Sequence, residues 1–291
     1  MYSTTAISKN SKFSGKIVGT HQQLDQAARK ILTHFLPHDK YFPSDKEIIH
    51  FEGTRGPDGL KRKSPGEDEP SHLLMPAQDQ PPANPCQITL DELKTYPLTK
   101  IILDHRWNLV QALREHNEYR AAFEAAWMAH YLTDGLTPAH HFPLSSAKEE
   151  LMTNKEFVKI FGEPIKGIMH GRSSLETARN NWLYWGAGGI MTKHVAFEYG
   201  VVTIAMSLPQ RRFMPQINPA DFHQVDPVQA FYDSLKIISA LNMYDEFRQE
   251  GWTTQLAFET KDILLPEIIR ATARLWYSAA VEAYKLESKC R

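Results

Sequence analysis

The stretch EYRAAFEAAWMAHYLTDGLTPAH, residues 118–140, combines a helical pattern with three potential metal ligands. The helical pattern runs to about residue 134, and Gly135 and Pro138 then favour the end of the helix. His130 and Asp134 are four residues apart, so their side chains share one helix face, and we expect the following turn to bring His140 beside them. Chance predicts far fewer than one His-x-x-x-Asp-x-x-x-x-x-His triplet in a chain with 13 histidines. The stretch therefore predicts a metal site at the end of a central helix.

Helical patterns also occupy much of the remaining chain. Apolar residues recur every three to four positions, as in helices that bury one face, over residues 21–36, 98–115, 173–207, 227–249 and 258–287. Thr20 is the expected N-cap of the first of these helices, and Gly186, Gly188 and Gly189 weaken the pattern of the third. Because no alternating strand pattern is found, the sequence predicts an all-α fold, a bundle of six to eight helices with long loops.

Composition limits the classes of function. The formal net charge is −1 and 42% of the 291 residues are apolar, which is ordinary for a globular protein and does not favour stable nucleic-acid binding. No apolar run approaches the length of a transmembrane span, and the start of the chain shows no signal peptide. Residues 1–15 are polar and are predicted to form a flexible tail. Residues 53–88, rich in proline and glycine, are predicted to form a long loop.

Further candidate ligands lie on both sides of the triplet. His194 and Glu198 have helical i, i+4 spacing, although an exposed helix pair is an equal alternative. Asp58 and His72 lie in the long loop, where ordinary solvated side chains are the alternative. His21 begins the first helix and is otherwise a surface histidine, with Asp25 one turn away as a possible partner.

The chemistry of this set favours zinc. Nitrogen and carboxylate ligands without thiolate are typical of catalytic zinc sites. Eight candidates exceed what one tetrahedral ion needs, so we expect two or three zinc ions, with Asp134 as the natural bridge between them. Residues 16–291 are accordingly predicted to form a single all-α zinc-dependent catalytic domain.

The order of these residues resembles the zinc-dependent bacterial phospholipases C, whose superfamily includes fungal single-strand nucleases. In that family a histidine of the first helix, a loop Asp followed fourteen residues later by His, the His-x-x-x-Asp-x-x-x-x-x-His triplet and a final His-x-x-x-Glu carry three zinc ions. The resemblance spans about residues 15–200 of this chain. It implies three zinc sites, formed by His140, His194 and Glu198, by Asp58, His72, His130 and Asp134, and by Asp134 with His21.

Two features of the chain depart from the family. In familiar members an N-terminal tryptophan completes the third zinc site, whereas the first tryptophan here is Trp107. The segment between His140 and His194 is also longer than in the compact bacterial enzymes. It includes Asn154–Arg172, is expected to form a lid or lipid-facing flap, and places His141 and His170 where either could replace an assigned ligand.

The resemblance implies a phospholipase C that hydrolyses the phosphodiester of phosphatidylcholine-like glycerophospholipids to diacylglycerol and a phosphorylated head group. Asp58 would orient the attacking water, the substrate would lie at a membrane or micelle surface, and the protein would be secreted or exported. The alternatives are a single-strand nuclease or 3′-nucleotidase of the same superfamily, and a non-catalytic interaction protein stabilised by zinc. Five aromatic residues are expected to line a head-group pocket or to pack between helices: Trp127, Tyr131, Phe142, Trp182 and Trp185.

Overall fold

The computed structural model describes residues 19–52, 55–57, 87–142, 144–156, 159 and 167–285. These residues form helices joined by turns and loops, and no β-strand occurs among them. The predicted all-α class is therefore confirmed. The predicted tail, residues 1–15, and most of the predicted loop at residues 53–88 lie outside the described residues.

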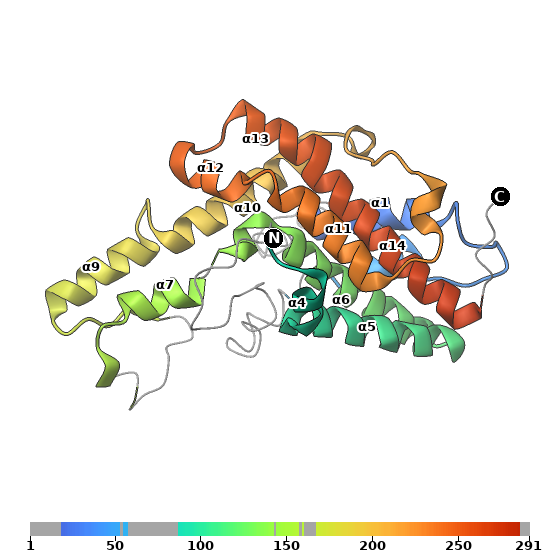
Figure 1. Ribbon diagram of the computed structural model, residues 1–291, viewed down its shortest axis with the longest axis horizontal. Coiled ribbons are helices and arrows are strands. Elements are labelled where there is room, and N and C mark those ends of the chain that lie inside the picture. The colour runs from blue at the N-terminus through green and yellow to red at the C-terminus, as the bar shows by residue number, and fades with distance from the viewer. Residues whose placement is uncertain are drawn as a thin grey trace, which may run out of the picture.

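The body of the molecule is a bundle around two long helices. α6 (Glu118–Leu136) pairs with α5 (Pro97–Arg114), and α14 (Leu265–Tyr284) packs against α5, α6, α1 (Thr20–Leu32) and α11 (Pro227–Ser239) (Figure 1). The apolar faces of these helices meet in one large core. The shorter elements of the body include α2 (Asp45–Ile49), α4 (Leu90–Thr95), η5 (Gln210–Arg212) and η6 (Pro219–Phe222).

Small residues let α6 lie in the middle of this bundle. A Cβ atom added at Gly135 would be 2.7 Å from Leu98 Cδ2 and 3.0 Å from Phe231 Cζ, so glycine permits the close approach of α5 and α11. Gly135 therefore lies within the last turn of α6 and does not stop it, contrary to our expectation. The helix ends at Leu136, and Pro138 begins the 3-10 turn η4 (Pro138–His141).

Three predicted helical stretches are divided or shifted, so the described residues form more helices than the six to eight expected. Residues 173–207 form α9 (Ser174–Trp185) and α10 (Ile190–Ser207), separated at the predicted glycines. Residues 227–249 form α11 and α12 (Met243–Glu250), where Asn242 has a left-handed backbone (φ 54°). The last stretch begins earlier, with α13 (Thr254–Glu259) and a π-helical turn (Thr260–Leu264) before α14.

The first helix also begins differently from our prediction. Gly19, and not Thr20, is its N-cap, and the Gly19 amide donates a hydrogen bond to Gln22 Oε1 (2.8 Å). Thr20 is instead buried as the first helical residue. This register matters because it directs the next residue, His21, into the interior.

An arm extends from the bundle. It consists of α7 (Leu144–Leu151), α9 and the described residues between them, and α10 connects it to the body (Figure 1). The arm has its own small core of buried Met152, Met169 and Tyr184. The arm is thus inserted in the sequence between two groups of predicted ligands, those of α6 and η4 and those of α10.

Candidate metal centre

Four elements bring six of the eight predicted ligands into the interior. α1 contributes one residue, the C-terminal turns of α6 contribute two, η4 contributes one and α10 contributes two. All six are buried, with at most 5% of any of them exposed. They form two groups of three, within each of which the potential ligand atoms lie within 4.8 Å of one another: His21, His130 and Asp134, and His140, His194 and Glu198.

The first group is centred on the carboxylate of Asp134. Its Oδ1 lies 3.5 Å from His21 Nε2 and its Oδ2 lies 3.4 Å from His130 Nε2. The two imidazole rings stack with their centroids 4.1 Å apart and 11° between their planes. The i, i+4 spacing on α6 explains how His130 reaches Asp134, whereas His21 reaches it because α1 packs against α6.

The second group is centred on Glu198. Its Oε1 accepts a hydrogen bond from His140 Nε2 (2.8 Å) and lies 3.5 Å from His194 Nε2. The two imidazole rings are 5.0 Å apart and meet edge to face. A zinc ion held by His140 Nε2 and Glu198 would take the place of this hydrogen bond, and the proton of the neutral His140 ring would then be on Nδ1.

The two groups are neighbours. Asp134 Oδ1 lies 3.8 Å from His140 Nε2, so the central carboxylate of the first group faces a ligand of the second. This is the position expected of a bridging residue. The grouping agrees with the implied site of His140, His194 and Glu198, and it brings His21 into the same cluster as His130.

One residue of the centre was missed by the sequence analysis. Glu52, which follows α2, is 3% exposed, and its Oε2 accepts a hydrogen bond from His130 Nδ1 (3.2 Å). Because Asp134 lies at the opposite nitrogen of the same ring, Glu52 would orient the imidazole without ligating the metal itself. No spacing motif relates Glu52 to the other residues, so only the packing of α2 against α6 reveals it.

Asp25 adds a second buried carboxyl group on this side of the centre. It lies one turn after His21 on α1 and is 2% exposed. Burial, together with the negative charge of Glu52, raises its pKa well above the usual value. The interior thus favours the protonated form of Asp25 more than water does for an exposed carboxyl group.

The pKa values of His130 in α6 and His140 in η4 are shifted in opposite directions. Burial lowers the pKa of His140 to about 4, so its imidazole is neutral at pH 7 and can serve as a metal ligand. Burial also opposes the charged form of His130, but the charges of Glu52 and Asp134 outweigh it and raise its pKa well above the usual value. The neighbouring carboxylates thus favour the protonated form of His130, so a metal ion would compete with this proton.

The residues of the centre fit zinc. Each group offers two imidazoles and one carboxylate, the donor set of catalytic zinc sites that keep a position for water or substrate. Buried polar atoms without a hydrogen-bond partner among the described residues surround the groups: Asp25 Oδ2, Glu52 Oε1 and His194 Nδ1. Such atoms are costly in an interior unless a cation or water is bound nearby.

Asp58 and His72 lie outside the described residues. His141, one of the two possible replacements, donates from Nε2 to the Gly135 carbonyl (2.8 Å), and neither it nor His170 belongs to the two groups. Among the aromatic candidates, Trp127 and Tyr131 pack around His105.

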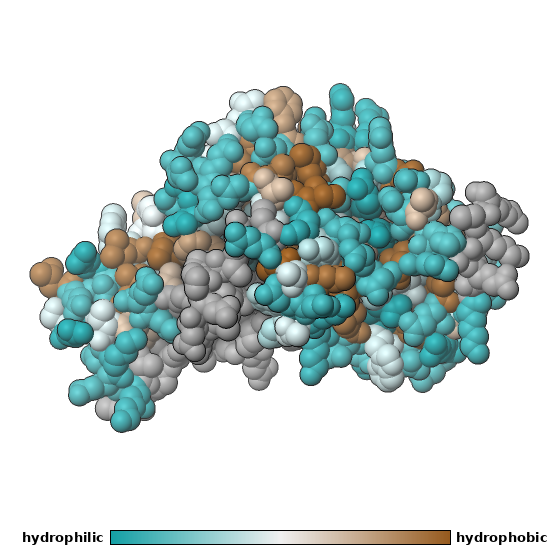
Figure 2. Space-filling view, in the orientation of Figure 1, coloured by the Kyte–Doolittle hydropathy of each residue, from teal (hydrophilic) through white to brown (hydrophobic). Residues whose placement is uncertain are grey.

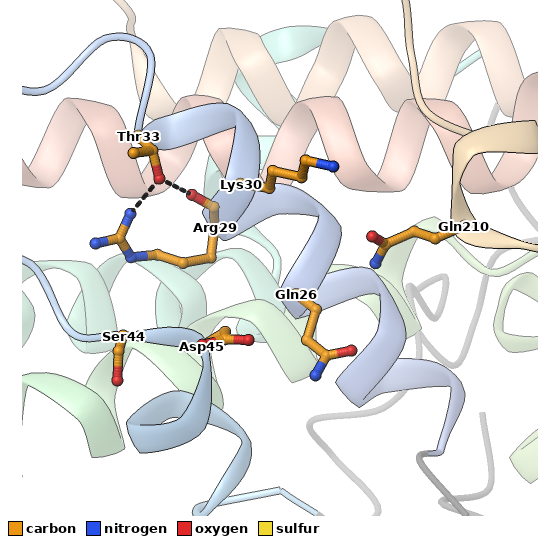
Figure 3. A pocket seen from close by; sticks show the side chains of 7 residues that line it. All are labelled: Gln26, Arg29, Lys30, Thr33, Ser44, Asp45 and Gln210. Atoms are coloured by element: carbon orange, nitrogen blue, oxygen red, sulfur yellow. Dashed lines mark hydrogen bonds between the residues drawn. The ribbon is translucent and has the colours of Figure 1, made fainter.

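A separate surface pocket of about 480 Å³ lies between α1, α2 and η5 (Figure 3). Arg29 lines this pocket, but its guanidinium already forms hydrogen bonds within the protein. It donates to the carbonyls of Pro43 (2.6 Å) and Phe42 (3.2 Å) and to Thr33 Oγ1 (2.9 Å). None of the lining residues belongs to the metal centre. We therefore do not assign the function to this pocket.

Two further findings bear on function. None of the described helices combines the length and apolar character needed to cross a bilayer, in agreement with our expectation for this part of the chain. Comparison with known proteins gives no match, because no family model, curated protein or solved structure is significantly similar to the chain.

Proposed function

We propose that this protein is a zinc-dependent phosphodiester hydrolase that acts on glycerophospholipids as a phospholipase C. The observation that carries the proposal is the adjacency of two buried ligand groups across Asp134, whose Oδ1 lies 3.8 Å from His140 Nε2. Two neighbouring cations suit phosphodiester cleavage because they neutralise both the attacked phosphate and the leaving oxygen. The resemblance described above supplies the lipid substrate class.

The side chains of the centre have different proposed roles in the reaction. Bound zinc would supply Lewis-acid neutralisation of the phosphate and a lower pKa for water. Asp134 Oδ1 lies near Nε2 of both His21 and His140, and its Oδ2 lies near His130 Nε2. Glu52 would hold the His130 ring so that Nε2 faces Asp134. Burial of all six ligands excludes bulk water and strengthens their electrostatic interactions. We assign the orientation of the attacking water to Asp58, as the resemblance implies.

Removal of the central carboxylate tests this proposal. We expect Asp134→Ala to lose at least one equivalent of zinc by elemental analysis and to reduce hydrolysis of phosphatidylcholine by about a thousandfold or more, because one residue serves both groups. The control is Asp262→Ala, which removes an exposed carboxylate outside the centre. Full zinc content together with full activity in Asp134→Ala would contradict the assignment.

A single-strand nuclease of the same superfamily is the second candidate. Those nucleases usually close the last ligand pair with Asp, whereas Glu198 occupies that position here, and the net charge of −1 does not favour a nucleic-acid channel. Parallel assays on phosphatidylcholine and single-stranded DNA, with and without a chelator, separate the two activities. Zinc-dependent stability without hydrolysis of either substrate would instead indicate the non-catalytic interaction protein.

A further inference from the structure

The outer face of α9 is unusually apolar for a solvent-exposed helix. Leu175 is 82% exposed, Trp182 is 69% exposed and Trp185 is 46% exposed, and Ile168 and Leu183 lie in the same arm at 55% and 42%. Figure 2 shows hydrophobic surface along this part of the arm. Single exposed apolar residues are normal, but several together, including two tryptophans, mark an interaction surface.

The arm holds this face outward. Asn180 and Tyr184, on the opposite side of α9, are buried, and Asn180 Nδ2 donates to the Leu151 carbonyl (2.6 Å). Trp185 Nε1 donates to the Gly167 carbonyl (3.1 Å), which fixes one indole while leaving half of it exposed. The apolar residues of the outer face therefore do not serve the core of the arm.

Two exposed arginines lie beside this face, next to the carboxylate of Glu176. Arg172 and Arg179 are exposed, whereas the carboxylate of Glu176 is used internally, accepting hydrogen bonds from the Thr153 hydroxyl (2.9 Å) and the Arg172 amide (2.7 Å). Tryptophan and arginine around an aliphatic patch suit a layer where phosphate groups meet hydrocarbon. In a symmetric contact between two copies the same arginines would face like charges.

We propose that the outer face of α9 docks the protein on the phosphate-bearing surface of a phospholipid bilayer or micelle. The inference rests on the proposed function and names how its substrate is reached. The arm continues through Gly186–Gly189 into α10, whose early turns carry His194 and Glu198. Docking through α9 would thus hold the lipid surface at an element that is directly continuous with the second ligand group.

The experiment measures binding of the full-length, zinc-loaded protein to sedimented vesicles of phosphatidylcholine mixed with phosphatidylglycerol. We expect the double variant Leu175→Ser, Trp182→Ser to lower the vesicle partition coefficient by about tenfold or more, because two apolar side chains no longer enter the interface. We expect Arg172→Gln, Arg179→Gln to weaken binding to these vesicles more than to vesicles of phosphatidylcholine alone. Lipids brominated near the head group should quench the wild-type tryptophan fluorescence.

The matched control is Trp107→Ser, which removes a 59% exposed tryptophan from α5 and should bind as the wild type does. Equal binding by the α9 variant and this control would overturn the proposal. So would a concentration-dependent dimer, or binding of single-stranded DNA, that the α9 variant abolishes while vesicle binding persists. Vesicle binding without hydrolysis of any phosphodiester would refute the proposed function but not the docking surface. Hydrolysis of a soluble phosphodiester without vesicle binding would refute the docking surface but not the proposed function.

Discussion

At the scale of single residues, the candidate metal centre pairs imidazoles with carboxylates. His130 lies between two of them, with Asp134 Oδ2 3.4 Å from Nε2 and Glu52 Oε2 3.2 Å from Nδ1. A carboxylate behind a ligating histidine selects the tautomer and raises the basicity of the metal-facing nitrogen. Glu52 would therefore act as a positioning residue, although its place in the sequence gives no indication of this.

The substitution Glu52→Gln tests that role. It keeps the size of the side chain but removes the negative charge, so we expect zinc affinity to fall by about tenfold to a hundredfold. Competition with a chromophoric chelator measures the affinity, and circular dichroism should show an unchanged fold. Glu118→Gln, an exposed residue at the start of α6, is the control. Equal zinc affinity in the two variants would show that Glu52 does not act on the metal through His130.

At the scale of elements, α10 owes its position to a glycine. A Cβ atom at Gly200 would lie 1.9 Å from Trp252 Cε2, so the indole packs directly on the helix backbone. Trp252 also stacks on Phe197, with ring centroids 5.4 Å apart, and donates to the Ala196 carbonyl (3.3 Å). This contact locks the helix that carries the second ligand group against the C-terminal part of the chain.

Gly200→Ala should displace this indole. We expect the free energy of unfolding to fall by about 1–3 kcal/mol, as for other overpacked sites, measured by urea denaturation followed through tryptophan fluorescence. Gly188→Ala is the matched control because nothing lies within 4 Å of a Cβ atom there. A Gly200→Ala protein as stable as the control would mean that Trp252 can move aside without cost.

At the scale of the whole molecule, the centre joins segments that are distant in sequence. α1, the end of α6, η4 and α10 each contribute candidate ligands, and the arm is inserted between the last two of these elements. Ions bound here would link the first helix to the middle of the chain. Metal binding should therefore stabilise the native bundle as a unit, because the unfolded chain cannot assemble the site.

Chelation provides the corresponding measurement. With zinc at about a hundred times its dissociation constant, we expect stabilisation by about 2.7 kcal/mol per independent site, seen as a lower Tm after chelator treatment and recovery when zinc is restored. Substitution of the exposed histidines His34 and His38 by Gln should leave this shift unchanged. A Tm that is insensitive to chelation in protein confirmed to have contained zinc would argue against this centre.

The all-α class and the helices that begin near residues 97 and 118 were predictable from the sequence, because periodicity and capping act over a few residues. The i, i+4 pairs His130 with Asp134 and His194 with Glu198 were predictable for the same reason. Helix ends were less so: Gly135 was expected to stop α6, yet the close approach of Leu98 and Phe231 explains why glycine is there.

Local pattern therefore determined which side chains share a helix face, and the tertiary structure alone decided which of those faces meet. The juxtaposition of Asp134 with His140 and His21, the support of His130 by Glu52, and the outward turn of the α9 tryptophans all depend on packing between distant segments. Spacing along a chain has no direct bearing on such contacts, because they arise only when burial of apolar surface brings separate helices together.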